Sequence, residues 1–152
     1  MKISGQLDNR LIKFDLSGNT KEEVIKELVS LVYDANLIGN PEKVSKLVID
    51  REELHPTGIG RKTAVPHARI ENIDRVIVAA GIHNKGIDFK SRDGSKANVI
   101  FLMLAPEDDT TLYLQTLSSL AMLLMIGDLS DKLIECKSGD EFIKIFKTSE
   151  DL

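Results

Sequence analysis

One short segment of this chain combines a histidine, glycines and several cations at a spacing that suits chemistry on an anion. The segment covers residues 51–69, REELHPTGIGRKTAVPHAR, and its histidine, His67, directly follows Val65 and Pro66. An imidazole with a pKa near ~6.5 keeps a lone pair on one ring nitrogen at neutral pH, so it can accept a phosphoryl group and pass it on. The segment therefore predicts a histidine that handles an anion, and a phosphoryl group is the anion that fits best.

The same segment supplies side chains that can hold the oxygens of such an anion. Four cationic residues lie close to the histidine in sequence, although the chain has a formal net charge of -4: Arg51, Arg61, Lys62 and Arg69. An arginine binds phosphoryl oxygens through its forked donors, and Arg51 is the residue to which we assign this role. Arg61 and Lys62 are typical of solvent-exposed surface.

A glycine turn and a proline complete the predicted site. The run Gly58, Ile59 and Gly60 offers backbone N–H groups, which can cradle phosphate oxygens. Pro66 has a fixed φ and restricts the residue before it, so it can hold the backbone that aims the histidine ring. Each of these signals is weak alone, because most glycines of this kind form turns and most single histidines are structural.

Length and composition bound the class of protein. The 152 residues predict one domain over residues 1–152, and 42% hydrophobic with 29% charged residues is typical of a soluble globular chain. The single cysteine, Cys136, cannot form an intramolecular disulfide and fits the cytoplasm. We expect no signal peptide and no direct membrane insertion, because the apolar runs are shorter than the ~20 residues of a spanning helix. The acidic balance argues against nucleic acid.

The remaining candidates for chemistry carry less information. His55 precedes Pro56 and is interpreted as a helix-end residue, with a place next to the site as the alternative. His83, in the run HNKG, is interpreted as a surface residue in a turn. Three histidines without a short spacing do not predict a zinc site, so we expect no metal and no cofactor. Cys136 is expected to be buried and unreactive.

Helix signals occur at four places along the chain. Thr20 and Glu23 have the spacing of a capping box and precede apolar residues at helical intervals, and Ser138 and Glu141 repeat this pattern near the end of the chain. Asn40 and Pro41 open a further helix that should run to about Glu53. A leucine-rich helix should follow residues 108–111.

Two β-branched apolar runs, Arg75–Gly81 and Asn98–Leu104, predict buried strands, and residues 87–89 predict a short strand between them. Residues 55–66 are rich in turn formers and predict an ordered loop. Helices before, between and after strands predict an α/β (α+β) fold, in which one mixed β-sheet is flanked by helices. The order of the strands does not follow from these patterns.

Several motifs together resemble one known family. Arg51-Glu52, Thr57–Gly60 (TGIG) and Ala64–His67 (AVPH) are similar to the enzyme IIA domain of the fructose/mannitol class of the bacterial phosphoenolpyruvate-dependent sugar phosphotransferase system. The nitrogen-regulatory enzyme IIA proteins share this pattern. The likeness continues in residues 104–106 (LAP) and 113–118 (YLQTLS), so it covers most of the chain.

The resemblance implies a fold, an activity and roles for residues. It implies that His67 accepts a phosphoryl group from the histidine phosphocarrier protein and passes it to a cysteine of a sugar-transport IIB component. Arg51 then stands where the family has an arginine that stabilises the phosphoryl group. Tyr113 occupies the position of the family's second active-site histidine, and Ala68 replaces a common glycine. A tyrosine donates a hydrogen bond but supplies no cation near neutral pH.

Three hypotheses follow. The first is a phosphoryl carrier, a cytoplasmic phosphotransferase that needs no cofactor. The second is a regulatory module that binds partner proteins according to the phosphorylation of His67, which adds roughly 1.5 to 2 negative charges. The third is a small hydrolase with His67 as general base, which would require a carboxylate to orient the imidazole.

Overall fold

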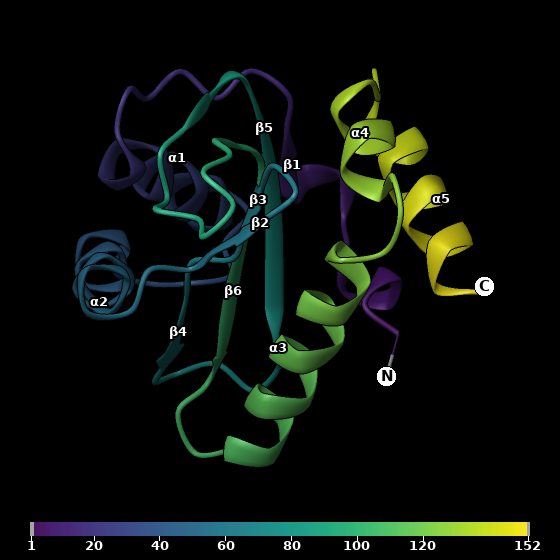
Figure 1. Ribbon diagram of the computed structural model, residues 1–152. Helices are drawn as coiled ribbons and strands as arrows, with labels where there is room; N and C mark the ends of the chain where they lie inside the picture. Colours follow the sequence, from purple (N-terminus) through teal and green to yellow (C-terminus); the bar gives the residue numbers. More distant parts are fainter. Residues whose placement is uncertain (1, 152) are drawn as a thin grey trace.

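The computed structural model describes residues 2–151 and confirms the predicted α/β fold (Figure 1). Across these residues five helices cover a six-stranded mixed sheet. The helices are α1 Lys21–Asp34, α2 Pro41–Leu54, α3 Thr110–Leu124, α4 Leu129–Ile134 and α5 Gly139–Glu150. The strands are β1 Ile12–Lys13, β2 Gly58–Gly60, β3 Thr63–Ala64, β4 His67–Ile70, β5 Ile77–Ile87 and β6 Ala97–Pro106. Two short 3₁₀ turns, Ser4–Gln6 and Asn9–Leu11, precede β1.

Strand β6 is the centre of the sheet. The strand order is β1-β5-β6-β3-β2, with β4 also paired to β6. Strands β3 and β4 run parallel to β6 and follow one another along it, opposite Val99–Ile100 and Met103–Pro106 respectively. Strand β5 pairs with the other side of β6 in the antiparallel direction. The chain between β3 and β4, Val65-Pro66, therefore lies at a point where the backbone is held on both sides.

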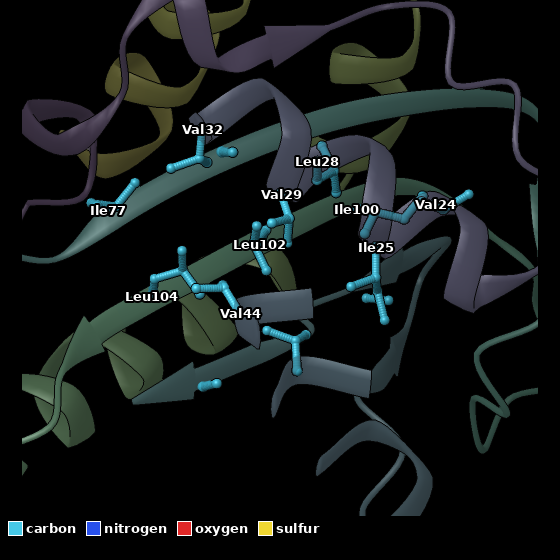
Figure 2. Close-up of a cluster of buried hydrophobic side chains, with 14 of the residues drawn as sticks. Val24, Ile25, Leu28, Val29, Val32, Val44, Ile77, Ile100, Leu102 and Leu104 are labelled. Carbon is cyan, nitrogen blue, oxygen red and sulfur yellow. The ribbon is translucent and has the colours of Figure 1, made fainter. Parts of the chain in front are cut away.

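Each face of the sheet carries its own apolar core, because helices cover both faces (Figure 1). Helices α1 and α2 pack on one face and bury side chains such as Leu28, Val32 and Leu102, as Figure 2 shows. Helices α3, α4 and α5 pack on the other face around Phe101 and Phe142. Strand β6 is buried almost throughout, as expected for a strand covered on both faces.

The helices begin where the sequence predicts. Thr20 accepts a hydrogen bond from the N–H of Glu23 at 3.2 Å, and Ser138 accepts one from Glu141 at 3.1 Å. Asn40 caps α2 through the N–H of Lys43, ahead of Pro41 at the first helical turn. These local bonds satisfy N–H groups that the first turn of a helix leaves free, so these helix starts can be read from sequence.

Several strand predictions were wrong or incomplete. The predicted loop 55–66 contains β2 and β3, which pair with each other in the antiparallel direction. Strand β5 continues through the HNKG run to Ile87, so residues 87–89 do not form a separate strand. The sequence patterns also missed β1, β4 and the six-residue helix α4. Strands β1, β3 and β4 pair with the distant strands β5 or β6, and no local pattern indicates that pairing.

Candidate functional site

His67 is the first residue of β4, a strand that pairs only with β6 among the described residues. The carbonyl of the preceding Pro66 accepts a hydrogen bond from the N–H of Met103 at 3.0 Å. The N–H of Val65 donates to the carbonyl of Thr57 at 3.1 Å. The backbone on the N-terminal side of the histidine is therefore fixed by two separate segments, which agrees with the predicted role of Pro66.

One ring nitrogen of His67 is used by the fold. Its Nδ1 lies 2.7 Å from the carbonyl oxygen of Val65. A carbonyl oxygen only accepts hydrogen bonds, so Nδ1 carries the proton and the neutral ring has its lone pair on Nε2. The ring is 8% exposed, and Nε2 has no hydrogen-bond partner within residues 2–151 yet is not sealed from solvent. The arrangement presents Nε2 as a nucleophile.

The surroundings favour the neutral form of this imidazole. Burial lowers the pKa of His67 below its usual value of 6.5. The hydrogen bond to Val65 opposes this change, and the positive charge of Arg51 lowers the pKa further. Because a peptide carbonyl and no carboxylate orients the ring, the arrangement lacks the third member that a histidine general base of a hydrolase requires.

Three side chains from three elements meet beside His67. The ring of Tyr113, in the first turns of α3, lies 5.8 Å from the imidazole, centre to centre, with the planes at 50°. The guanidinium carbon of Arg51, near the end of α2, is 5.8 Å from the centre of the Tyr113 ring. The guanidinium carbon of Arg69, on β4, is 5.4 Å from the same point. The site thus lies at the edge of the sheet, where the two helical layers approach each other.

The basic segment divides into two pairs of cations. Arg51 and Arg69 lie at the tyrosine ring beside the histidine. Arg61 instead donates to the carbonyl of Gly127 at 2.8 Å, and Lys62 forms an ion pair with Asp131 at 2.9 Å. The sequence alone did not single out Arg69, and the signal that could have found it is its position two residues after His67, on the same face of a strand.

The predicted glycine cradle is a strand rather than a turn. Gly58 pairs with Ala64 and Gly60 with Thr63, while Ile59 is half-buried and packs on the core beneath α3. A Cβ atom on Gly58 would lie 2.3 Å from the Ser91 hydroxyl and 2.7 Å from the Phe89 carbonyl, so close packing requires this glycine. Within the described chain no hydrogen bond links residues 58–60 to the His67 ring, and their role as a phosphate cradle stays a prediction.

A buried carboxylate that the sequence analysis did not single out positions the approach to β2. Glu52, 1% exposed, accepts hydrogen bonds from the N–H and the hydroxyl of Thr57. Burial raises the pKa of this carboxyl, and the two bonds from Thr57 lower it in part. The sequence neighbours Arg51 and Glu52 therefore have different contacts. Arg51 lies against the Tyr113 ring beside the histidine, and Glu52 binds Thr57 ahead of β2.

The other two histidines differ in exposure and in hydrogen bonding. His55 is exposed at the C-terminal end of α2, which agrees with its interpretation as a helix-end residue. The prediction that His83 lies on the surface was wrong, since it is 7% exposed within β5. Its Nε2 lies 2.8 Å from the carbonyl of Gly18, and its Nδ1 accepts from the N–H of Gly86 at 3.0 Å. Both nitrogens are thus used in holding the chain together.

Three further findings concern the cysteine, metal binding and membrane insertion. Cys136 is buried, as predicted, and burial raises the pKa of its thiol to about 11, so the unreactive thiol form prevails. Residues 2–151 bring together no group of three or more His, Cys, Asp or Glu side chains suited to a metal ion. None of the helices in that range has the length and apolar character needed to cross a membrane.

Comparison with known proteins identifies the family. Residues 6–149 match the family model described as "Phosphoenolpyruvate-dependent sugar phosphotransferase system, EIIA 2". The chain belongs to this family. The resemblance inferred from the TGIG and AVPH motifs is thereby confirmed.

The chain is similar in sequence to two relatives that are named as fructose-specific components. It is 32% identical over 145 residues to the fructose-specific EIIABC component of Bacillus subtilis, which covers 95% of the chain but only 23% of that longer protein. It is 32% identical over 128 residues to the fructose-specific EIIA component of Haloferax volcanii, covering 84% of the chain and 83% of the relative.

Solved structures of enzyme IIA proteins have the same fold as the chain. The crystal structure of the nitrogen regulatory protein IIA-Ntr from Neisseria meningitidis matches with a TM-score of 0.86 at 26% identity, over 95% of the chain and 98% of that protein. The mannitol enzyme IIA of Escherichia coli, solved in complex with phosphorylated enzyme IIB, has the same fold, with a TM-score of 0.76 at 22% identity over 93% of the chain and 97% of that one.

Proposed function

We propose that the chain is a phosphoryl carrier, in which Nε2 of His67 accepts a phosphoryl group from the histidine phosphocarrier protein. The observation that carries the proposal is the hydrogen bond of Nδ1 to the Val65 carbonyl, which leaves the lone pair of the neutral ring on Nε2. Membership of the EIIA 2 family supports a phosphotransferase activity of this general kind. The acceptor proposed for the second transfer is a cysteine of a sugar-transport IIB component.

The transfer step follows from the arrangement of the ring. The Nε2 lone pair forms a bond to phosphorus while the phosphorus–nitrogen bond of the donor phosphohistidine breaks, and that electron pair returns to the donor ring. His67 then carries the phosphoryl group on a ring whose Nδ1–H still donates to Val65. In the second step a cysteine thiolate attacks phosphorus and the electron pair returns to Nε2. Arg51 stabilises the equatorial oxygens, so the protein contributes positioning and charge.

Exposed apolar side chains around the site support the docking of protein partners. Leu54 is 75% exposed one turn after Arg51 on α2, and Leu114 is 55% exposed directly after Tyr113 on α3. Further exposed apolar residues extend along α3 and just beyond its end: Met122, Met125 and Ile126. Large apolar side chains flanking a nucleophile on two helices are typical of a surface that another protein covers. We propose that the phosphocarrier protein and the IIB component use this surface in turn.

Several narrower statements are part of the proposal. We propose that residues 1–152 act as one enzyme IIA domain in the cytoplasm, where the single thiol of Cys136 stays reduced. The relative from Bacillus subtilis carries this region within a much longer protein, so a transport component joined to the chain or separate from it can serve as acceptor.

The direct test is incubation with phosphoenolpyruvate, enzyme I and the phosphocarrier protein. Wild type is expected to gain one acid-labile phosphate per chain, and His67→Gln none. His55→Gln is the matched control, because it removes an exposed histidine at the end of α2 and should gain as much phosphate as wild type. An unphosphorylated wild type, or a His67→Gln variant phosphorylated to the same extent, would contradict the proposal.

A regulatory function is the second candidate, and the likeness to the nitrogen regulatory protein of Neisseria meningitidis favours it. In this version the phosphoryl group on His67 changes the charge of the surface between Leu54 and Leu114, and a partner protein binds one state only. Affinity capture with unmodified and phosphorylated protein separates the two functions. A partner recovered equally from both states would count against regulation, while transfer to an IIB cysteine would favour transport.

A further inference from the structure

Arg69 occupies a place that the transfer scheme above does not use. It stands two residues after His67 on β4, so both side chains leave the strand on the same face. Its Nη1 donates to the hydroxyl of Thr110 at 3.0 Å, and its guanidinium carbon lies 5.4 Å from the centre of the Tyr113 ring. The guanidinium is therefore anchored next to the imidazole by two contacts, and most of its five donors remain available.

Arg51 and Arg69 contact the same aromatic ring without an acidic partner. Within residues 2–151 no carboxylate lies within ion-pair distance of either guanidinium. Both are drawn against the same aromatic ring, where two like charges repel each other. Such an arrangement is relieved by an anion placed between the two cations. The imidazole of His67, whose Nε2 can carry an anion, lies 5.8 Å from the same ring, centre to centre.

We propose that Arg69 is a second phosphoryl-binding residue of the His67 site, and that Tyr113 is the support that holds Arg51 and Arg69 for this task. The inference rests on the proposed function and adds to it a residue and a division of roles. The phosphoryl group carries roughly 1.5 to 2 negative charges, which one guanidinium cannot balance and two can. Arg69 thereby supplies the cation that Tyr113, at the position of the family's second histidine, does not provide.

The aromatic face of Tyr113 explains why a tyrosine suits this position. A guanidinium over an aromatic ring is attracted by the ring's negative face and stays ordered without a carboxylate that would compete with the phosphoryl group. The ring also contacts the imidazole, so one side chain sets the position of the nucleophile and of both cations.

The test is single-turnover phosphoryl transfer from the phosphorylated phosphocarrier protein to Arg69→Gln, Arg69→Lys and wild type. Arg69→Gln should slow transfer roughly 10- to 100-fold, the loss expected when a charged hydrogen-bond donor to a developing anion is removed. Arg69→Lys should recover part of the rate, because it restores the charge but not the fork. Affinity for the unphosphorylated phosphocarrier should stay unchanged, since the proposed contact is made only to the phosphoryl group.

Two further variants separate this role from a structural one. Arg61→Gln removes an exposed arginine from the same segment, bound to Gly127 away from the histidine, and should transfer at the wild-type rate. Tyr113→Leu removes the aromatic face and should be as slow as Arg69→Gln or slower, whereas Tyr113→Phe keeps that face and should transfer faster than Tyr113→Leu. Equal rates for Arg69→Gln and wild type, or an Arg69→Gln defect explained wholly by weaker docking, would overturn the inference.

The outcomes also distinguish this inference from the proposed function. If wild type gains no phosphate on His67, the phosphoryl-carrier function fails and the role of Arg69 fails with it. If wild type and Arg69→Gln are phosphorylated at the same rate, the carrier function stands and only the role of Arg69 is wrong.

Discussion

Two histidines of this protein are buried to nearly the same degree but are connected in opposite ways. His67 is 8% exposed and His83 is 7% exposed. His83 has both ring nitrogens in hydrogen bonds, one with the carbonyl of Gly18 and one with the N–H of Gly86. His67 uses only Nδ1, with the carbonyl of Val65, and its Nε2 has no partner within residues 2–151. Burial alone therefore does not separate the proposed phosphoryl acceptor from a structural histidine.

The difference lies in what each ring connects. One bond of His83 joins β5 to Gly18, in the segment before α1 and 65 positions away, and the other holds Gly86 within β5. The single bond of His67 goes to a carbonyl two residues earlier, so it fixes the direction of the ring without joining distant parts of the fold. A local bond on one nitrogen leaves the other for chemistry, and two bonds leave none. Exchanging or removing these histidines tests that distinction.

The largest effect is expected for His67→Gln. Glutamine keeps polar atoms in the site but has no nucleophilic nitrogen, so phosphorylation by the phosphocarrier protein should fall below detection. The fold should persist, because the side chain of His67 makes no hydrogen bond to a distant segment. Phosphate incorporation checks the loss of phosphorylation, and the thermal midpoint of the same sample checks that the fold persists. A large fall in the thermal midpoint of His67→Gln relative to wild type would show that His67 has the structural role assigned to His83.

His83→Ala should give the reverse result. Removing the ring leaves the carbonyl of Gly18 and the N–H of Gly86 without their partner and opens a cavity, which together cost roughly 2 to 4 kcal/mol. The folded fraction should accept phosphate at the wild-type rate. Urea unfolding measures the first quantity and single-turnover transfer the second. Wild-type stability with slow transfer would place His83 in the site.

The pH dependence of His67 sharpens the comparison. Since burial holds the pKa of His67 below 6.5, the folded state binds fewer protons than the unfolded chain between that lowered value and 6.5. The stability linked to His67 is therefore complete above pH 6.5 and is lost as pH falls toward the folded pKa. Wild type should lose more stability than His67→Gln on acidification in this window. The acid limb of the transfer rate should also lie below pH 6.5, and a limb centred above it would contradict the burial argument.

The smallest effect is expected for His55→Gln. This histidine is exposed at the end of α2, and only its backbone N–H is used, donating to the carbonyl of Arg51 at 2.9 Å. Surface replacements of this kind change stability by less than about 0.5 kcal/mol. Both the urea midpoint and the transfer rate should match wild type. A slowed transfer would instead make His55 a neighbour of the site, the alternative interpretation of its place before Pro56.

Sequence patterns predicted the features of this fold that depend on local contacts. The caps at Thr20, Asn40 and Ser138 bind N–H groups within three residues, so their helices could be placed to within a residue or two. The AVPH motif located His67, and its bond to Val65 is local as well. Strand β4 was missed because four residues become a strand only through pairing with β6, more than thirty residues away.

The role of Arg69 was missed and the position of His83 was predicted wrongly for the same physical reason. In the sequence Arg69 is equivalent to Arg61, and the two differ only because the fold brings Gly127 to Arg61 and Tyr113 to Arg69. The local sequence predicts that His83 lies in a surface turn, and only the fold brings the carbonyl of Gly18 beside its ring. Side chains whose partners are distant in sequence acquire their roles from the fold, and such partners cannot be read from local motifs.

The most direct test of the central claim is the identification of the phosphorylated atom. Wild-type protein is phosphorylated with phosphoenolpyruvate, enzyme I and the phosphocarrier protein, and ³¹P and ¹⁵N NMR spectra assign the modified ring nitrogen. We predict one phosphohistidine, at His67, with phosphorus on Nε2 and a proton retained on Nδ1. Phosphorus on Nδ1, phosphate on another residue, or no phosphate at all would contradict the account.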